Sequence, residues 1–284
     1  MKTINYILKR FRKRILFFCL FISLVMFCIM EQEMIQAYQE IEEIDSFRMF
    51  YISEELWTSL EEQYGEQTEE FYDAFTVRMM QTKFNPEANK KSLPKLFIKA
   101  GIFRSRYIEY KTMYQTILQG ISCFPVAEDI KGGETISFDD SWGGERTYGG
   151  NRQHEGCDVM TSNNKRGYFP IVSMTDGVVE KKGWLPLGGY RLGIRSTSGA
   201  YFYYAHLHSY SEGIEEGSTV RAGDLIGFMG DTGYSEVEGT VGNFDVHLHM
   251  GIYIDYQGEE MSVNPYWVLR HYESKKRPFY NKTS

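Results

Sequence analysis

The fold is decided around Tyr201-Phe-Tyr-Tyr-Ala-His206, an aromatic run whose alternate side chains would face opposite sides of a strand. Similar short runs stand on either side of it, among them Gly177-Val-Val-Glu-Lys-Lys-Gly-Trp184 and Val220-Arg-Ala-Gly-Asp-Leu-Ile-Gly227. Short strands separated by glycine-containing turns are typical of a compact all-β sandwich or barrel. We therefore predict an all-β domain over residues 126–272, with an antiparallel, barrel-sandwich-like sheet.

The end of the chain has a different pattern. Asn264-Pro265 is expected to open a short helix that runs from Tyr266 to about Tyr272. Residues 273–284 are rich in Lys and Ser, and we expect them to form a flexible tail.

The region before the β domain, residues 31–125, is expected to be mainly helical, because Glu, Lys, Gln and Met are abundant there. Phe71, Phe75 and Met79 are spaced four apart and make an apolar stripe along one helix face. A second stripe contains Tyr107, Tyr110, Tyr114, Ile117 and Leu118. We expect both stripes to pack between helices as core. The alternative is a membrane-proximal stalk or a surface that binds a protein partner.

The N-terminus carries a basic segment followed by an apolar one. Residues 1–14 contain six basic and no acidic side chains, and residues 15–30 are almost entirely apolar. Sixteen residues of helix span about 24 Å, and basic side chains that snorkel can close the gap to a core of about 30 Å. Because basic flanks stay in the cytoplasm, we predict a basic cytoplasmic tail over 1–14 and a transmembrane signal anchor over 15–30. A cleaved signal peptide is the alternative, although no small-x-small cleavage site is seen near Met30.

The charge of the remaining chain limits its partners. The whole sequence has 31 basic and 38 acidic residues, so the part after residue 30 has a net charge of −13. Such a surface repels phosphate backbones, and we expect no nucleic-acid partner.

The four cysteines give a weaker indication. Cys19 and Cys28 lie in the apolar N-terminal stretch and are read as apolar fillers. Cys123 and Cys157 lie in the exported part, where a disulfide between them is conceivable. The absence of a Cys-x-x-Cys motif argues against a structural zinc ribbon.

Five of the six histidines fall into three motifs within a hundred residues, and only His271 lies outside them. The motifs are His154-Glu-Gly-Cys-Asp158, His206-Leu-His208 and Asp245-Val-His247-Leu-His249. Histidine is the commonest metal ligand, so this concentration indicates a metal site.

The spacing of these motifs suits a catalytic zinc centre. Side chains at i and i+2 of a strand share a face, so both members of each His-x-His pair should project together. His154 and Asp158 are four apart and share a face on a strand or a helical turn. Two histidines and one carboxylate form a known ligand set for catalytic zinc with one open position, whereas calcium and magnesium prefer oxygen ligands. The spacing leaves open which His-x-His pair would hold the metal.

The order of these motifs resembles the lysostaphin/LytM-type zinc metallopeptidases, which cut peptide bonds of bacterial cell-wall peptidoglycan. The resemblance covers about residues 140–272. The matching elements are Tyr148-Gly-Gly-Asn-Arg-Gln-His154-Glu-Gly-Cys-Asp158, Thr175-Asp-Gly-Val-Val179, Tyr204-Ala-His206-Leu207, Val220-Arg-Ala-Gly-Asp224, Gly230-Asp-Thr-Gly233, His247-Leu-His249 and Asn264-Pro265.

The resemblance implies one zinc ion per chain, bound by His154, Asp158 and His249. Zinc of this kind lowers the pKa of a water molecule to about 7 and polarises the scissile carbonyl. The family's His-x-His is often followed by Phe, and Met250 stands there in this sequence. Both residues are apolar, so we expect no loss of function from this difference.

The resemblance also implies catalytic roles for His206 and His247, which would act on the water and the reacting groups. Tyr148 corresponds to a tyrosine that helps to stabilise the oxyanion. His208 and His271 have no counterpart in the family's motifs, and we expect surface or structural roles for them.

These observations predict a membrane-anchored zinc metalloendopeptidase with its catalytic domain on the cell-wall side and a peptidoglycan peptide as substrate. The first alternative is an inactive relative that serves as a scaffold or activator of another hydrolase. The second is a lipoyl- or biotinyl-type carrier, suggested by the run from Gly217 to Gly227, but no Met-Lys-Met motif is present to be modified. The sequence leaves open which wall bond is cut.

Overall fold

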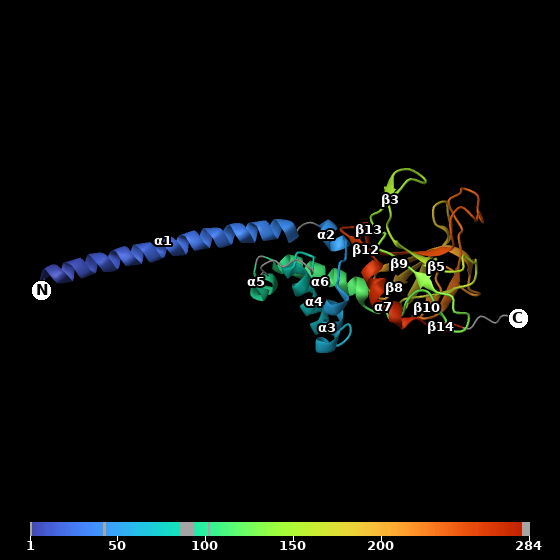
Figure 1. The fold of residues 1–284 in the computed structure, drawn as a ribbon, viewed down its shortest axis with the longest axis horizontal. Coiled ribbons are helices and arrows are strands. Elements are labelled where there is room, and N and C mark those ends of the chain that lie inside the picture. Colours follow the sequence, from blue (N-terminus) through green and yellow to red (C-terminus); the bar gives the residue numbers. More distant parts are fainter. Residues whose placement is uncertain (1, 42–43, 86–93, 102, 280–284) are drawn as a thin grey trace. The chain divides into compact units, whose positions relative to one another are not determined.

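The first unit of the protein is an N-terminal helix. The computed structural model describes residues 2–41, 44–85, 94–101 and 103–279, and it divides into two units, Met1–Ile44 and Asp45–Ser284. The first unit consists of α1 (Lys2–Ile41), a single continuous helix (Figure 1). Within the described residues, its stretch Arg10–Gln36 is long and apolar enough to cross a membrane, judged by length and composition alone. The predicted anchor, residues 15–30, lies inside this stretch, although a signal sequence near the N-terminus would pass the same test.

Short helices open the second unit, and side-chain caps set the starts of the two that begin at Glu54 and Glu69. Ser53 accepts a hydrogen bond from the backbone N–H of Leu56, and Thr68 accepts one from Phe71, so each satisfies an N–H at its helix start. Glutamates in the first turns of both helices add favourable charge. The helices of this unit are α2 (Ile44–Arg48), α3 (Glu54–Tyr64), α4 (Glu69–Gln81), α5 (Lys95–Ala100), α6 (Arg104–Leu118) and, near the C-terminus, α7 (Tyr266–Tyr272).

The two predicted apolar stripes form the core between α4 and α6. Phe75 of α4 is fully buried, and its ring lies 4.7 Å from that of Tyr114 in α6, in an edge-to-face arrangement. The other members of both stripes are buried as well. The helical region therefore packs as we predicted from its 3.6-residue period.

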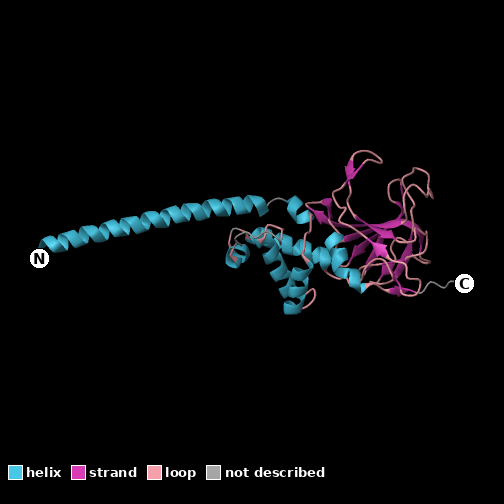
Figure 2. Cartoon of the chain, viewed as in Figure 1, coloured by secondary structure: helices cyan, strands magenta, loops and turns pink. Residues whose placement is uncertain are grey.

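The second half of the unit is built of short strands, which gather in one part of the ribbon (Figure 2). The strands are β1 (Glu128–Asp129), β2 (Ile136–Ser137), β3 (Glu145–Arg146), β4 (Arg152–Gln153), β5 (Cys157–Thr161), β6 (Pro170–Val172), β7 (Gly177–Leu185), β8 (Gly189–Ser196), β9 (Tyr201–Tyr210), β10 (Thr219–Val220), β11 (Leu225–Met229), β12 (His247–Tyr256), β13 (Glu259–Val263) and β14 (Pro278–Phe279).

Ten of these strands form one antiparallel sheet, which confirms the predicted fold class. Its main order is β10-β7-β8-β9-β12-β5-β2, while β13 pairs with β12 and β11 pairs with both β6 and β9. One face carries the core, where Leu192, Phe202 and Leu248 are completely buried. The opposite face of the central strands carries the histidines described below.

Hydrogen bonds join the helices to the sheet within the second unit. Arg48 Nε donates to the carbonyl of Ser262 at 3.0 Å. The amide of Gln67 donates to the hydroxyl of Tyr272 in α7 at 3.0 Å. Ser198 Oγ, after β8, donates to the carbonyl of Thr116 in α6 at 2.8 Å. The helical region is thus bonded to the second half of the unit through Arg48, Gln67 and Thr116.

The C-terminal segment and the two cysteines of the second unit differ from the expectations. The predicted helix Tyr266–Tyr272 is present as α7, but the chain beyond it does not fray at once. A 3₁₀ turn covers Glu273–Lys275, and β14 pairs in parallel with β1, while residues 280–284 lie outside the described part. Cys123 and Cys157 are both buried and unpaired, and each thiol donates to a backbone carbonyl.

We predict that Phe75→Ala lowers the free energy of unfolding by about 3–5 kcal/mol, because the Phe75 ring is fully buried and its removal leaves a cavity. Urea denaturation of the full chain in detergent, followed by tryptophan fluorescence, measures this. Ile108→Ala in α6 is the control, since Ile108 is 46% exposed. Equal losses for the two variants would contradict the assignment of the core.

Candidate metal centre

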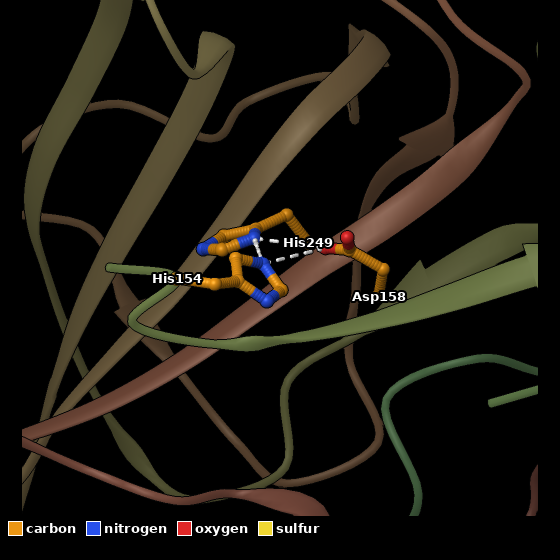
Figure 3. A group of neighbouring side chains, drawn as sticks. All are labelled: His154, Asp158 and His249. Atoms are coloured by element: carbon orange, nitrogen blue, oxygen red, sulfur yellow. Dashed lines mark hydrogen bonds and ion pairs between the residues drawn. The ribbon is translucent and has the colours of Figure 1, made fainter. Parts of the chain in front are cut away.

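The site begins with the pairing of two strands. In the antiparallel register of β5 with β12, Asp158 lies directly opposite His249, which puts their side chains on one face. Their atoms meet, with 3.0 Å between Asp158 Oδ1 and His249 Nδ1 (Figure 3). Gly156, just before β5, leaves room for this imidazole, because a Cβ at residue 156 would lie 2.6 Å from His249 Nε2.

His154 completes the group from the loop between β4 and β5. Its Nε2 lies 2.9 Å from His249 Nδ1 and 3.1 Å from Asp158 Oδ1 (Figure 3). Its backbone is held by the N–H of Gly143, which donates to the His154 carbonyl, and by its own N–H, which donates to Gly144. The three predicted ligands therefore form one cluster whose donor atoms lie within 4.8 Å of one another and could hold a metal ion.

The contacts of His154 bear on which of its nitrogens can bind a metal ion. Its Nδ1 lies 2.9 Å from the carbonyl oxygen of Ser141, which can only accept, and 3.1 Å from Arg146 Nη2, which can only donate. The shorter contact favours a proton on Nδ1, and a neutral ring in that tautomer has a lone pair at Nε2. That lone pair faces a carboxylate oxygen of Asp158 and His249 Nδ1, which is also an electron-pair donor when the proton of that ring is on Nε2. Such a convergence of lone pairs is favourable when a cation or a proton lies between them. The donor set of two imidazoles and one carboxylate fits zinc.

Charge in the cluster is concentrated on Asp158. Burial raises the pKa of the Asp158 carboxyl, but its contacts with His154 and His249 outweigh that effect and hold the pKa well below its usual range. Arg146 of β3 donates from Nη2 to Asp158 Oδ2 at 2.8 Å. Asp158 is therefore ionised at neutral pH, with one oxygen held by Arg146 and the other facing the imidazoles.

The two predicted catalytic histidines lie beside this cluster. The ring of His206 lies 4.7 Å from that of His247 and 5.9 Å from that of His249. His206 Nδ1 donates to the carbonyl of Thr232 at 2.8 Å, and His247 Nδ1 donates to that of Asp245 at 2.7 Å. Both bonds leave Nε2 as the free acceptor when the ring is neutral. Burial, together with the neighbouring His247 and His249, lowers the pKa of His206 well below its ordinary value, so this ring is neutral at pH 7.

The expectation that His206 and His208 project together is wrong. His206 is buried in the site, whereas His208 is exposed. The cause is the backbone of His206, whose φ of 62° lies in the left-handed region and breaks the alternation of the strand. At this residue β9 also changes partner, from β12 over 201–205 to β11 from Leu207 onward.

Tyr148, expected at the oxyanion, is not brought against the imidazoles. It is 44% exposed, and its ring stacks on that of Tyr234 with 4.3 Å between centroids. Tyr234 does face the site, with its ring 6.0 Å from that of His206. The sequence reasoning missed Tyr234 and Arg146. Tyr234 directly follows the quoted motif Gly230-Asp-Thr-Gly233, whereas no local pattern marks Arg146.

The three clustered ligands, His206, His247, Arg146 and Tyr234 line one open groove with a volume of about 570 Å³. Its floor is the face of β8, β9, β12 and β5 that is opposite the core. Beside the cluster and the catalytic histidines, the groove is lined by Tyr201, Tyr203, Tyr253, Arg152 and Arg191. A groove of this form can hold an extended peptide across the cluster of His154, Asp158 and His249.

The comparisons with known proteins agree with this geometry. The model of peptidase family M23 matches residues 152–265. A solved structure from Ruminococcus gnavus ATCC 29149, described as a candidate glycyl-glycine endopeptidase lytM, is 41% identical, and the match covers 83% of this chain and 93% of that one with a TM-score of 0.70. The chain belongs to peptidase family M23. The match to the R. gnavus protein covers more than the β domain alone contains, so it includes part of the helical region.

Two further proteins are similar to about half of this chain. The L-Ala–D-Glu endopeptidase of Bacillus subtilis (strain 168) is 41% identical over 145 residues, which are 49% of this chain and 43% of that protein. This chain therefore matches less than half of the length of that relative. The catalytic domain of lysostaphin from Staphylococcus simulans is 24% identical and covers 48% of this chain and 92% of that one, with a TM-score of 0.38.

We predict that the full chain in detergent binds one zinc ion and that His249→Ala largely loses it, because His249 contributes one of three clustered donor atoms. Metal analysis after gel filtration measures zinc per chain. His208→Ala is the matched control, since this histidine is exposed and lies outside the groove. Full zinc content in the His249→Ala variant would contradict the ligand assignment.

Proposed function

We propose that this protein is a membrane-anchored zinc metalloendopeptidase that hydrolyses peptide bonds of bacterial cell-wall peptidoglycan. The observation that carries the proposal is the convergence of His154, Asp158 and His249, with two more imidazoles beside them, on the floor of one groove. Membership of family M23 supports the same reaction. We assign zinc to the three clustered ligands, one ion per chain.

The protein's own residues account for the proton transfers. When bound, zinc supplies Lewis-acid chemistry that lowers the pKa of a water molecule to about 7. His206 is neutral and presents a free Nε2, so it can accept a proton from the attacking water and pass it to the leaving amine. His247 Nε2, 3.8 Å from Asp158 Oδ1, is the second candidate for this role.

Stabilisation of the oxyanion needs a hydrogen-bond donor that faces the reacting carbonyl. A protonated His247 would supply such a donor from the floor of the groove. Tyr148 remains our predicted donor from the resemblance to the family. The hydroxyl of Tyr234, whose ring stacks on Tyr148 and lines the groove, is the alternative that the geometry favours.

An inactive scaffold or activator is the main alternative, because family M23 includes inactive members. A protein that no longer hydrolyses peptide bonds needs neither the catalytic histidines nor the complete ligand set. Here all five residues are present and clustered, which favours an enzyme. The carrier-domain alternative has no support, since Val220–Gly227 contributes to β10 and β11, which are strands of the ten-stranded peptidase sheet.

The proposed location follows from α1. With basic residues at the start of the helix and the apolar stretch after them, the N-terminus would stay in the cytoplasm and the M23 domain would face the cell wall. A peptidoglycan peptidase needs this side of the membrane to reach its substrate. We propose that the helices after α1 hold the domain near the membrane and offer a surface for a protein partner.

The bond that is cut is not decided by similarity. Two relatives of equal identity, 41%, have names that differ: one is described as an L-Ala–D-Glu endopeptidase and the other as a candidate glycyl-glycine endopeptidase. The first substrate carries a carboxylate near the scissile bond, and the second carries none. The charged side chains of the groove are therefore the feature that can distinguish the two substrates.

We predict that His206→Ala keeps its zinc and loses hydrolysis by about 10²- to 10⁴-fold, because the variant lacks the proton acceptor. Release of muropeptides from purified sacculi measures activity, and metal analysis measures zinc. His208→Ala serves again as the control and should release muropeptides normally. Undiminished release by His206→Ala would contradict the catalytic role, and zinc without any release by the unmodified protein would favour the scaffold.

We predict that the chain stays in the membrane fraction after a carbonate wash, since an apolar helix that spans the bilayer is not extracted by high pH. Immunoblotting of the pellet and supernatant, with N-terminal sequencing, measures this. A soluble product that begins after residue 30 would show that the apolar segment is a cleaved signal peptide.

A further inference from the structure

Two cations that line the groove, Arg191 and Lys181, form no ion pair within the part of the chain that the structure describes. Arg191 of β8 lines the groove, yet no carboxylate lies within ion-pair distance of its guanidinium there. One of its nitrogens, Nη1, is enclosed and has no hydrogen-bond partner among the described residues. An enclosed charged nitrogen without a partner is costly, so such groups are normally paired.

Arg191 lies close to the metal ligands in the sheet. Leu192, next to it on β8, is fully buried in the core, so Arg191 faces the groove by strand alternation. β8 pairs with β9, and β9 pairs with β12 where Ala205 lies opposite His249. The backbone of Arg191 is thus two strands away from that of His249, or about 10 Å. The long side chain of Arg191 can cover much of that distance. The remaining separation corresponds to one or two residues of an extended peptide.

The other two arginines of the groove have hydrogen-bond partners, and the groove also carries Lys181, which is exposed, and the carboxylates of Glu155, Glu180 and Glu260. Arg146 binds the carboxylate of Asp158, and Glu180 is paired with Arg195 at 2.6 Å. Arg152 donates to the Tyr148 carbonyl and the Tyr234 hydroxyl, both at 3.4 Å. Arg191 is therefore the groove cation, among the described residues, with an enclosed and unpaired nitrogen.

We infer that Arg191 binds a carboxylate of the substrate and so selects an acidic stem peptide over a neutral glycine bridge. This inference rests on the proposed function and names a specificity-determining residue of the same groove. A guanidinium binds a carboxylate through two parallel N–H donors. A neutral amide lacks the negative charge and the second acceptor oxygen that this pairing uses. A D-glutamyl residue has two carboxyl groups, of which chain extension uses only one, so a carboxylate remains beside an L-Ala–D-Glu bond. Glycyl-glycine offers none.

Two probes that differ by one charge test the inference. N-acetyl-L-alanyl-D-glutamine has a free α-carboxylate, and its α-amide is identical except for that group. In the His206→Ala background, which would not cleave the probes, titration calorimetry of the zinc-loaded full chain measures binding of each. We expect the acid to bind about 10- to 100-fold more tightly than the amide, and Arg191→Gln to remove that preference without changing the binding of the amide.

The controls separate charge recognition from structural damage. Arg191→Lys keeps the charge and should keep part of the preference, and Arg221→Gln, at an exposed arginine outside the groove, should keep all of it. Unchanged zinc content and melting temperature would show that Arg191→Gln folds. Equal binding of acid and amide by the parent protein, or an equal loss of both in Arg191→Gln, would overturn the inference.

The same probes distinguish failure of this inference from failure of the proposed function. If the chain with His206 intact cleaves neither probe nor sacculi, but Arg191→Gln abolishes the preference for the acid, the peptidase activity fails and the carboxylate site stands. If the chain cleaves both probes at equal rates and Arg191→Gln changes neither, the activity stands and the role of Arg191 is refuted.

Discussion

The pairing of β5 with β12 is the constraint on which the site depends. Its register puts Asp158 opposite His249, and a slip of one residue would turn one of these side chains into the core. The core opposes such a slip, because Val159 and Leu248 are completely buried on the other face of the same two strands. Apolar packing on one face therefore holds the carboxylate and the imidazole together on the other. His154 then needs only a short loop before β5 to reach them.

A second constraint is local to His206. β9 pairs with β12 before this residue and with β11 after it, and the left-handed backbone of His206 makes the change. A non-glycine residue in this conformation costs about 1–3 kcal/mol, and such residues concentrate at functional sites. The carbonyl of Thr232 then fixes the imidazole through Nδ1. Strand geometry and one hydrogen bond thus orient the ring toward the metal ligands.

The helical region is part of the same unit as the sheet. Its core consists of aromatic side chains between α4 and α6, and its hydrogen bonds reach Ser262, Tyr272 and Ser198 of the β domain. The match to the R. gnavus structure covers 83% of this chain, which is more than the β domain alone contains. A helical region bonded in this way holds the groove at a set position relative to α2, which follows the N-terminal helix in sequence.

The sequence by itself determined the features that depend on local periodicity and composition. Strand alternation predicted that His247 and His249 share a face, helical spacing predicted the buried stripes around Phe75 and Tyr114, and Asn264-Pro265 predicted the start of α7. The family's motifs further selected His154, Asp158 and His249, whose meeting the structure then displays.

Only the tertiary structure decided which of these residues meet which others. It separated His206 from His208, because a left-handed residue interrupts the alternation that local spacing assumes. It brought Tyr234 rather than Tyr148 toward the imidazoles. Arg191 belongs to none of the sequence motifs, and the enclosure of its Nη1 is a property of the folded sheet in which β8 pairs with β9. The physical reason is common to all three: strand partners and register are set by contacts between residues far apart in the chain, which no local pattern contains.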